Sequence, residues 1–194
     1  SPVAVACASV GGSGEGLSDP LLASVVPVRS GHPPRQPLRV ILDTNLCTPI
    51  GSQVASGLLD GTSLIVGVDD GSAAWAARRT ALSRPSVEVV SVAAGSDGRP
   101  EAAAVLDLLG ERGVTTLLVE GGATVHASFF GAGLVDRVAA VVAPVVIGGG
   151  PSAVGSALTG PTLLADAWRL AECTVSRLGE DVLVSGWLRF PRWA

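Results

Sequence analysis

A glutamate and two glycines that could bind a small ligand follow an apolar run in TTLLVEGGATVHASFFGAGLVDRV, residues 115–138. The run LLV is typical of a buried strand, and Glu120 stands where that strand gives way to its loop. Ligands of open α/β sheets bind in the crevice beyond the carboxyl ends of the strands. Gly121 and Gly122 let backbone N–H groups approach a ligand, and the N-terminus of the helix expected next suits a phosphate. A diphosphate could be held here without a lysine.

A second glycine cluster, APVVIGGGPSAVG at 143–155, predicts the same arrangement of a strand, a glycine run and small residues. Two glycine-rich loops after strands of one sheet are typical of a dinucleotide crevice. A glycine pair alone is weaker, since many turns need it only for geometry. His126 is predicted on a helix surface without a partner at local spacing, and His32 lies in a proline-rich loop without metal-ligand spacing. No metal site is expected.

Alternating segments must position these residues. Strands are predicted for 38–43, 63–68, 87–92 and 115–120, and helices for 52–59, 72–82 and 100–113. Pro100 is expected in a first helical turn and Gly113 at a C-cap. This alternation indicates a parallel sheet with crossover helices. The last two runs, 168–178 and 181–190, are joined by the dipeptide GE and predict an antiparallel hairpin.

The composition fits one globular domain over residues 1–194. No apolar run approaches the roughly 18 residues of a membrane span, so we expect no membrane partner and a cytoplasmic protein. A net charge of -4 and the absence of lysine argue against nucleic-acid binding, which needs a basic face. Cys7, Cys47 and Cys173 are far apart and odd in number, so each is expected to be a small buried hydrophobe.

The order of these motifs resembles a known family. The segment GVTTLLVEGGATVHASFFGAGLVDRVAAVVAPVVIGGG is similar to the VEGGP-(S/T)-L, GLVDE and APVLLGG segments of the reductase domain of riboflavin biosynthesis, the dihydrofolate-reductase-like half of the bifunctional deaminase-reductase. PLRVILDTNLCTP, SDPLLASVVPVR and SRLGEDVLVSG extend the resemblance from Ser18 to Leu188. It implies an α/β fold with a dihydrofolate-reductase-like mixed sheet, mostly parallel, with a C-terminal antiparallel hairpin and helices on both faces.

The resemblance also implies an NADPH-dependent oxidoreductase and a homodimer. The family reduces a phosphorylated small molecule, 5-amino-6-(5-phosphoribosylamino)uracil, delivering hydride to the ribose C1′ of an opened imine. Glu120 resembles the family's substrate-contacting carboxylate, which binds hydroxyl or uracil N–H groups, and is the expected catalytic residue. Further substrate contacts are expected from Ser9, Asp19, Leu22 and Arg29. Cofactor contacts are expected from Thr44, Gly121, Gly122, Ala123, Thr124, Val125, Gly148 and Gly149.

Three departures from the family leave alternatives open. The segment ASVGG at 8–12 resembles a degenerate form of the family's ASLDG. Between it and SDPLL, this chain has only SGEG, where the family has a helix and a further strand. Asn45 and Cys47 stand where the family usually places basic residues, which leaves NADH possible beside NADPH. Arg29 stands four residues beyond the position of the family's substrate arginine. A related NAD(P)H reductase of another pterin- or pyrimidine-like substrate and a non-catalytic scaffold remnant stay open.

Overall fold

The computed structural model describes the backbone of residues 4–10 and, with side chains, residues 37–56, 61–148, 152–155, 158, 164 and 167–189. The chain divides into two compact units, Ser1–Glu120 and Gly121–Ala194, and each is described by itself. The expectation of one reductase-like domain over residues 1–194 stays a prediction. Within the described residues, no helix is long and apolar enough to cross a membrane.

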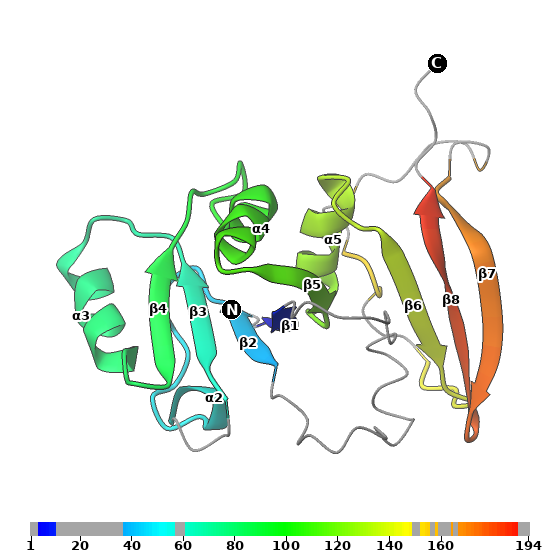
Figure 1. Ribbon diagram of the computed structural model, residues 1–194, viewed down its shortest axis with the longest axis horizontal. Coiled ribbons are helices and arrows are strands. Elements are labelled where there is room, and N and C mark those ends of the chain that lie inside the picture. Colours follow the sequence, from blue (N-terminus) through cyan, green and yellow to red (C-terminus); the bar gives the residue numbers. More distant parts are fainter. Residues whose placement is uncertain are drawn as a thin grey trace. The chain divides into compact units, whose positions relative to one another are not determined.

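The first unit is built on a five-stranded sheet with the order β4-β3-β2-β1-β5. Its strands are β1 (Ala4–Val10), β2 (Leu38–Leu42), β3 (Ser63–Gly67), β4 (Val87–Ser91) and β5 (Val114–Val119) (Figure 1). Strands β2, β3 and β4 pair in parallel, as the alternation of strands and helices predicted. Strand β1 lies between β2 and β5 and is antiparallel to both, which the sequence pattern did not anticipate.

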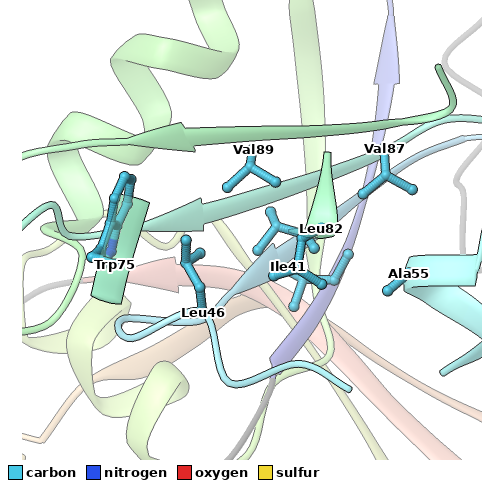
Figure 2. Packing of buried hydrophobic residues seen from close by; sticks show 8 residues of the cluster. Ile41, Leu46, Ala55, Trp75, Leu82, Val87 and Val89 are labelled. Carbon is cyan, nitrogen blue, oxygen red and sulfur yellow. The ribbon is translucent and has the colours of Figure 1, made fainter. Parts of the chain in front are cut away.

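Helices cover both faces of this sheet. They are α2 (Gln53–Ser56), α3 (Ala73–Leu82) and α4 (Ala102–Glu111). Because successive strand residues point to opposite faces, Val40 and Ile41 of β2 belong to different apolar clusters. Ile41 packs in the cluster that contains Trp75 of α3 (Figure 2), whereas Val40 packs in the cluster that contains Val105 of α4. Each large apolar side chain buried in this way stabilises the unit by about 1.5–3 kcal/mol.

Local sequence signals set the ends of the helices. The Ser72 hydroxyl caps α3 by accepting a hydrogen bond from the Trp75 N–H at 3.0 Å. Pro100 was expected in the first turn of α4, but it lies before the helix. It forms an isolated bridge with Ala94, and the helix begins at Ala102 after the N-cap Glu101. Gly113 follows α4 with a φ of 75°, a backbone conformation that favours glycine.

The second unit contains α5 (Ala123–Gly131) and a three-stranded sheet with the order β6-β8-β7. The strands are β6 (Arg137–Val142), β7 (Arg169–Leu178) and β8 (Asp181–Arg189), and all pairs are antiparallel. The C-terminal hairpin is therefore confirmed, with Gly179 at a φ of 65° in its turn.

Two further expectations from the sequence were wrong. The strand expected at the start of 143–155 lies earlier, as β6, and the exposed residues Val145, Val146 and Ile147 form no strand. The buried environment expected for cysteines does not hold for Cys47 or Cys173, which are both exposed. Cys47 lies in the turn after β2, and Cys173 lies in β7 at a register shift between Ala171 and Thr174, so neither position faces a core.

Candidate functional site

The carboxyl ends of four strands meet at one edge of the five-stranded sheet. Strand β1 is antiparallel to β2 and to β5, so β5 runs in the same direction as β2, β3 and β4. Asp43, Val68 and Glu120 directly follow β2, β3 and β5 and therefore share this edge. Glu120 is exposed. Edges of this kind are where open α/β sheets bind ligands.

A buried carboxylate fixes the turn after β2. Asp43 is 3% exposed, and its Oδ2 accepts hydrogen bonds from the N–H and from the Oγ1–H of Thr48, both at 2.6 Å. Between these residues, Leu46 has a φ of 54°, a left-handed conformation that costs free energy for a side chain of this size. The Leu46 side chain is buried in the core, and its N–H donates to the Asp43 carbonyl at 3.1 Å. The turn is thus held from both ends.

The turns after β2 and β3 pack closely against each other. The Val68 N–H donates to the Thr44 carbonyl at 3.1 Å. A Cβ at Gly67 would lie 3.0 Å from Leu46 Cδ2 and 3.1 Å from the Asp43 carbonyl oxygen, so a larger residue would push the turns apart. Thr44 is half-buried at this contact, and its neighbour Asn45 is exposed and uncharged.

Two carboxylates follow in the second of these turns. Asp69 accepts a hydrogen bond from the Gly71 N–H at 2.8 Å, and Asp70 accepts one from the Ser72 N–H at 2.8 Å. Hydrogen bonds from the Ser72 side chain and backbone hold the pKa of the Asp70 carboxyl below its ordinary value, and the charge of Arg78 adds to this. Both carboxylates are exposed, as expected of solvated turn residues.

Ser9 and Glu120 lie toward opposite ends of β5. The backbone of Ser9 pairs with Thr116, and that of Ala6 pairs with Val119, because β1 runs against β5. Four residues along a strand span about 13 Å, so Ser9 lies toward the amino end of β5, away from Glu120. The structure does not bring these two expected substrate residues together.

The N-terminus of α5 offers backbone donors. Gly122 is the N-cap residue, extended and exposed, with no side chain to cap the helix. The Gly122 carbonyl accepts from the N–H groups of Val125 and His126, whereas the structure gives no acceptor among its described residues for the N–H groups of Ala123 and Thr124. A Cβ at Gly122 would meet no atom within 4 Å. The first turn of α5 therefore has the donors and the space that an anionic group requires.

Part of the second glycine cluster contacts this turn. The Gly155 N–H donates to the Ala123 carbonyl at 2.8 Å, and His126 Nδ1 lies 2.9 Å from the Ala153 carbonyl oxygen. A Cβ at Gly155 would lie 3.0 Å from the Ala123 oxygen, so a larger residue would force the two backbones slightly apart. Local spacing in the sequence does not indicate this partner of His126, because Ala153 lies 27 positions later in the chain.

The two glycine-rich clusters thus meet within the second unit, although the strands before them, β5 and β6, belong to different sheets. The expectation that both glycine loops follow strands of one sheet is therefore wrong, because the two strands belong to different sheets. The segment that reaches α5 is residues 152–155, whereas Gly148 is exposed with a φ of 89° and no atom near its Cβ direction.

Several expected site residues lie outside the described residues. They are Asp19, Leu22, Arg29 and Gly149. Of the residues expected to hold a cofactor, Thr44 lies in the first unit and 121–125 in the second. Within the part of the chain that the structure describes, no three histidine, cysteine, aspartate or glutamate residues are grouped to hold a metal ion.

Comparison with known proteins adds independent information. A family model described as the RibD C-terminal domain matches residues 17–184. The riboflavin biosynthesis protein RibD of Bacillus amyloliquefaciens is 31% identical over 150 residues, which are 76% of this chain and 38% of that protein. The 2,5-diamino-6-ribosylamino-4(3H)-pyrimidinone 5′-phosphate reductase of Methanothermobacter thermautotrophicus is 33% identical over 152 residues, 78% of this chain and 66% of that protein. The chain spans less than two thirds of the length of either relative.

Solved structures show the same fold. Acinetobacter baumannii RibD, form 1, has a TM-score of 0.55 at 21% identity, over 77% of this chain and 37% of that chain. A pyrimidine reductase-like protein from Corynebacterium diphtheriae has a TM-score of 0.53 at 19% identity, over 78% of this chain and 61% of that chain. The expected α/β fold, with a parallel sheet and C-terminal antiparallel strands, is confirmed.

Proposed function

Because the chain belongs to the RibD C-terminal domain family, the pyrimidine reductases of riboflavin biosynthesis, we propose that it transfers a hydride from NADPH to the ribose C1′ of 5-amino-6-(5-phosphoribosylamino)uracil. The observation that carries the proposal is the VEGGAT segment, in which an exposed carboxylate precedes a glycine-capped helix whose first N–H groups have no acceptor among the described residues. This is the combination that a reductase of a polar substrate needs: a group for the substrate and a group for the cofactor diphosphate.

The first turn of α5 would hold the diphosphate. The N–H groups of Ala123 and Thr124 would donate to its oxygens, and Gly122 would leave room for the close approach. No lysine is needed, since the helix N-terminus itself carries partial positive charge. The bound NADPH would supply the hydride, and the protein would supply orientation and electrostatics. Thr44 is proposed at the adenosine end.

Glu120 would bind the substrate. Its exposed carboxylate at the end of β5 can accept hydrogen bonds from ribose hydroxyl or uracil N–H groups. Such bonds to a charged acceptor are stronger than neutral ones and would fix the sugar for hydride delivery. Ser9, Asp19, Leu22 and Arg29 are proposed as further substrate contacts from the resemblance alone.

A second substrate has specific support. The relatives from Methanothermobacter thermautotrophicus and Archaeoglobus fulgidus, 33% and 30% identical, are both named as reductases of 2,5-diamino-6-ribosylamino-4(3H)-pyrimidinone 5′-phosphate. This compound differs from the uracil in its ring substituents, while both carry a phosphorylated ribosylamino group. A reductase of the diaminopyrimidinone is therefore the alternative function.

The test measures NADPH oxidation by the protein with each of the two pyrimidines. We expect turnover with one of them and a fall in kcat/KM of roughly 10- to 100-fold in Glu120→Gln, because a hydrogen bond to a charged group contributes about 1.5–3 kcal/mol. Glu111→Gln, which changes an exposed carboxylate at the end of α4, is the matched control and should keep full activity. Full activity of Glu120→Gln would contradict the role of Glu120, and no turnover with either pyrimidine would contradict the function.

A further inference from the structure

We propose that His126 is a positioning residue, which holds residues 152–155 against the first turn of α5 and so shapes the site for the cofactor diphosphate. The inference rests on the proposed function, because it concerns the same dinucleotide site. Its basis is a pair of contacts that no local sequence pattern indicates.

The first contact is made by the imidazole ring. His126 Nδ1 lies 2.9 Å from the Ala153 carbonyl oxygen. A carbonyl oxygen can only accept, so this contact requires a proton on Nδ1, in either the neutral or the charged ring. The side chain is half-buried, and the contact ties α5 to a segment 27 positions later in the chain.

The second contact is made by Gly155, two residues after Ala153 in the same segment. The Gly155 N–H donates to the Ala123 carbonyl at 2.8 Å, in a close approach that a side chain at position 155 would widen. Ala123 and His126 are three residues apart in α5 and so lie on one side of the helix. The segment is therefore attached at two points, one to a backbone carbonyl and one to a side chain.

Both attachments flank the donors proposed for the diphosphate. Ala123 contributes its carbonyl to Gly155, and its N–H is one of the helix-start donors for which the described part of the chain holds no acceptor. Movement of the 152–155 segment would therefore shift the wall next to these donors. Proline is the one substitution that would remove the Gly155 N–H, and it would also restrict the backbone of the segment, so His126 is the point at which the attachment can be tested.

The experiment compares three substitutions with matched chemistry. His126→Ala removes the donor, His126→Asn keeps an amide nitrogen near the Nδ1 position, and His126→Gln places it near the Nε2 position. Thr80→Ala is the control, since the exposed Thr80 hydroxyl in α3 bonds only within its own helix. The dissociation constant of NADPH is measured by calorimetry, together with KM for NADPH, kcat, and amide exchange at Gly155.

We expect His126→Ala and His126→Gln to raise the dissociation constant and KM of NADPH by about three- to tenfold, as for a lost hydrogen bond, with kcat kept and faster exchange at Gly155. His126→Asn should stay within about twofold of the parent protein. A residue that served only helix stability would give the opposite order, because asparagine is a poorer helix former than alanine. The Asn variant therefore separates positioning from folding.

Two outcomes overturn the inference in different ways. Equal NADPH affinity in the parent protein and in His126→Ala, or affinity weaker in His126→Asn than in His126→Ala, would remove the positioning role and leave the reductase function standing. Absence of NADPH and NADH binding to the parent protein would remove the proposed function and the positioning role with it. If His126→Ala does not fold, the Asn and Gln variants are compared instead. Weaker NADPH binding in His126→Gln than in His126→Asn would support the positioning role, and equal binding would contradict it.

Discussion

Single side chains set the shape of the carboxyl edge in the first unit. Asp43 is buried and accepts two hydrogen bonds from Thr48, and this pair closes a turn whose central residue, Leu46, has a positive φ. From the sequence, Thr44 was the functional residue expected in this turn. The role of Asp43 could not be predicted, because a carboxylate after a strand is equally compatible with a solvated loop residue. Only the structure shows that it is buried.

The contribution of the Asp43 hydrogen bonds can be measured as a change in the free energy of unfolding. Asp43→Ala would leave the N–H and the hydroxyl of Thr48 without their acceptor, and we expect the free energy of unfolding to fall by about 3 kcal/mol in urea titrations. Asp97→Ala is the control, since Asp97 pairs with Arg99 at 3.2 Å on the exposed surface and should contribute less than about 1 kcal/mol. Similar losses in the two variants would show that the buried turn contributes no more than a surface ion pair.

At the scale of elements, most boundaries follow from local chemistry. Strands β2 to β5 and helices α3 and α4 lie close to their predicted ranges, because apolar period and capping residues act over a few positions. The direction of β1 and the partner of His126 depend on contacts between residues far apart in the chain, which periodicity does not encode. The run VVI after β6 has strand-like composition, yet it forms no strand. Pro144 beside it lacks the N–H that pairing requires.

The N-cap of α3 affects both the stability of the protein and the pKa of Asp70. Ser72→Ala would remove the cap of α3 and lower the free energy of unfolding by about 1 kcal/mol. It would also remove the main hydrogen bond that lowers the pKa of Asp70, so this pKa should rise toward its ordinary value in an NMR titration.

The sign of the pH dependence follows from this direction. Because the pKa of Asp70 is lower in the folded protein, its contribution to stability is present above the unfolded pKa and is lost as the pH falls through the folded pKa. The control is Thr80→Ala, which removes a hydroxyl from the same helix. An unchanged Asp70 pKa in Ser72→Ala would contradict the assigned cause.

At the scale of the whole molecule, we propose a homodimer that uses one face of the three-stranded sheet. Opposite residues in paired strands share a face, so Val175 of β7, Val184 of β8 and Ala140 of β6 lie in one row across the sheet. Val142 lies on the same face as this row, since it pairs with Val182 two positions from Val184. Val175 and Val142 are 68% and 58% exposed, and apolar surface of this kind is typical of an interface.

Sedimentation of the protein tests the dimer. We expect the parent chain to sediment as a dimer and Val175→Asp to sediment as a monomer, because a buried charge without a partner is strongly unfavourable. Ser176→Asp changes a neighbouring residue that points to the other face and should remain dimeric. A parent chain that sediments as a monomer would contradict the proposal, and a dimeric Val175→Asp would place the interface elsewhere.

The position of β1 in the sheet also determines when the first unit can be completed during synthesis. Ala6 pairs with Val119, and Ala4 pairs with Leu42, so strand β1 needs one partner from β2 and one from the end of its unit. The hairpin of β7 and β8, in contrast, joins neighbouring residues and can close at once. Strand β1 is therefore paired on both sides only after residue 119 has left the ribosome, and until then one of its edges is open to other chains.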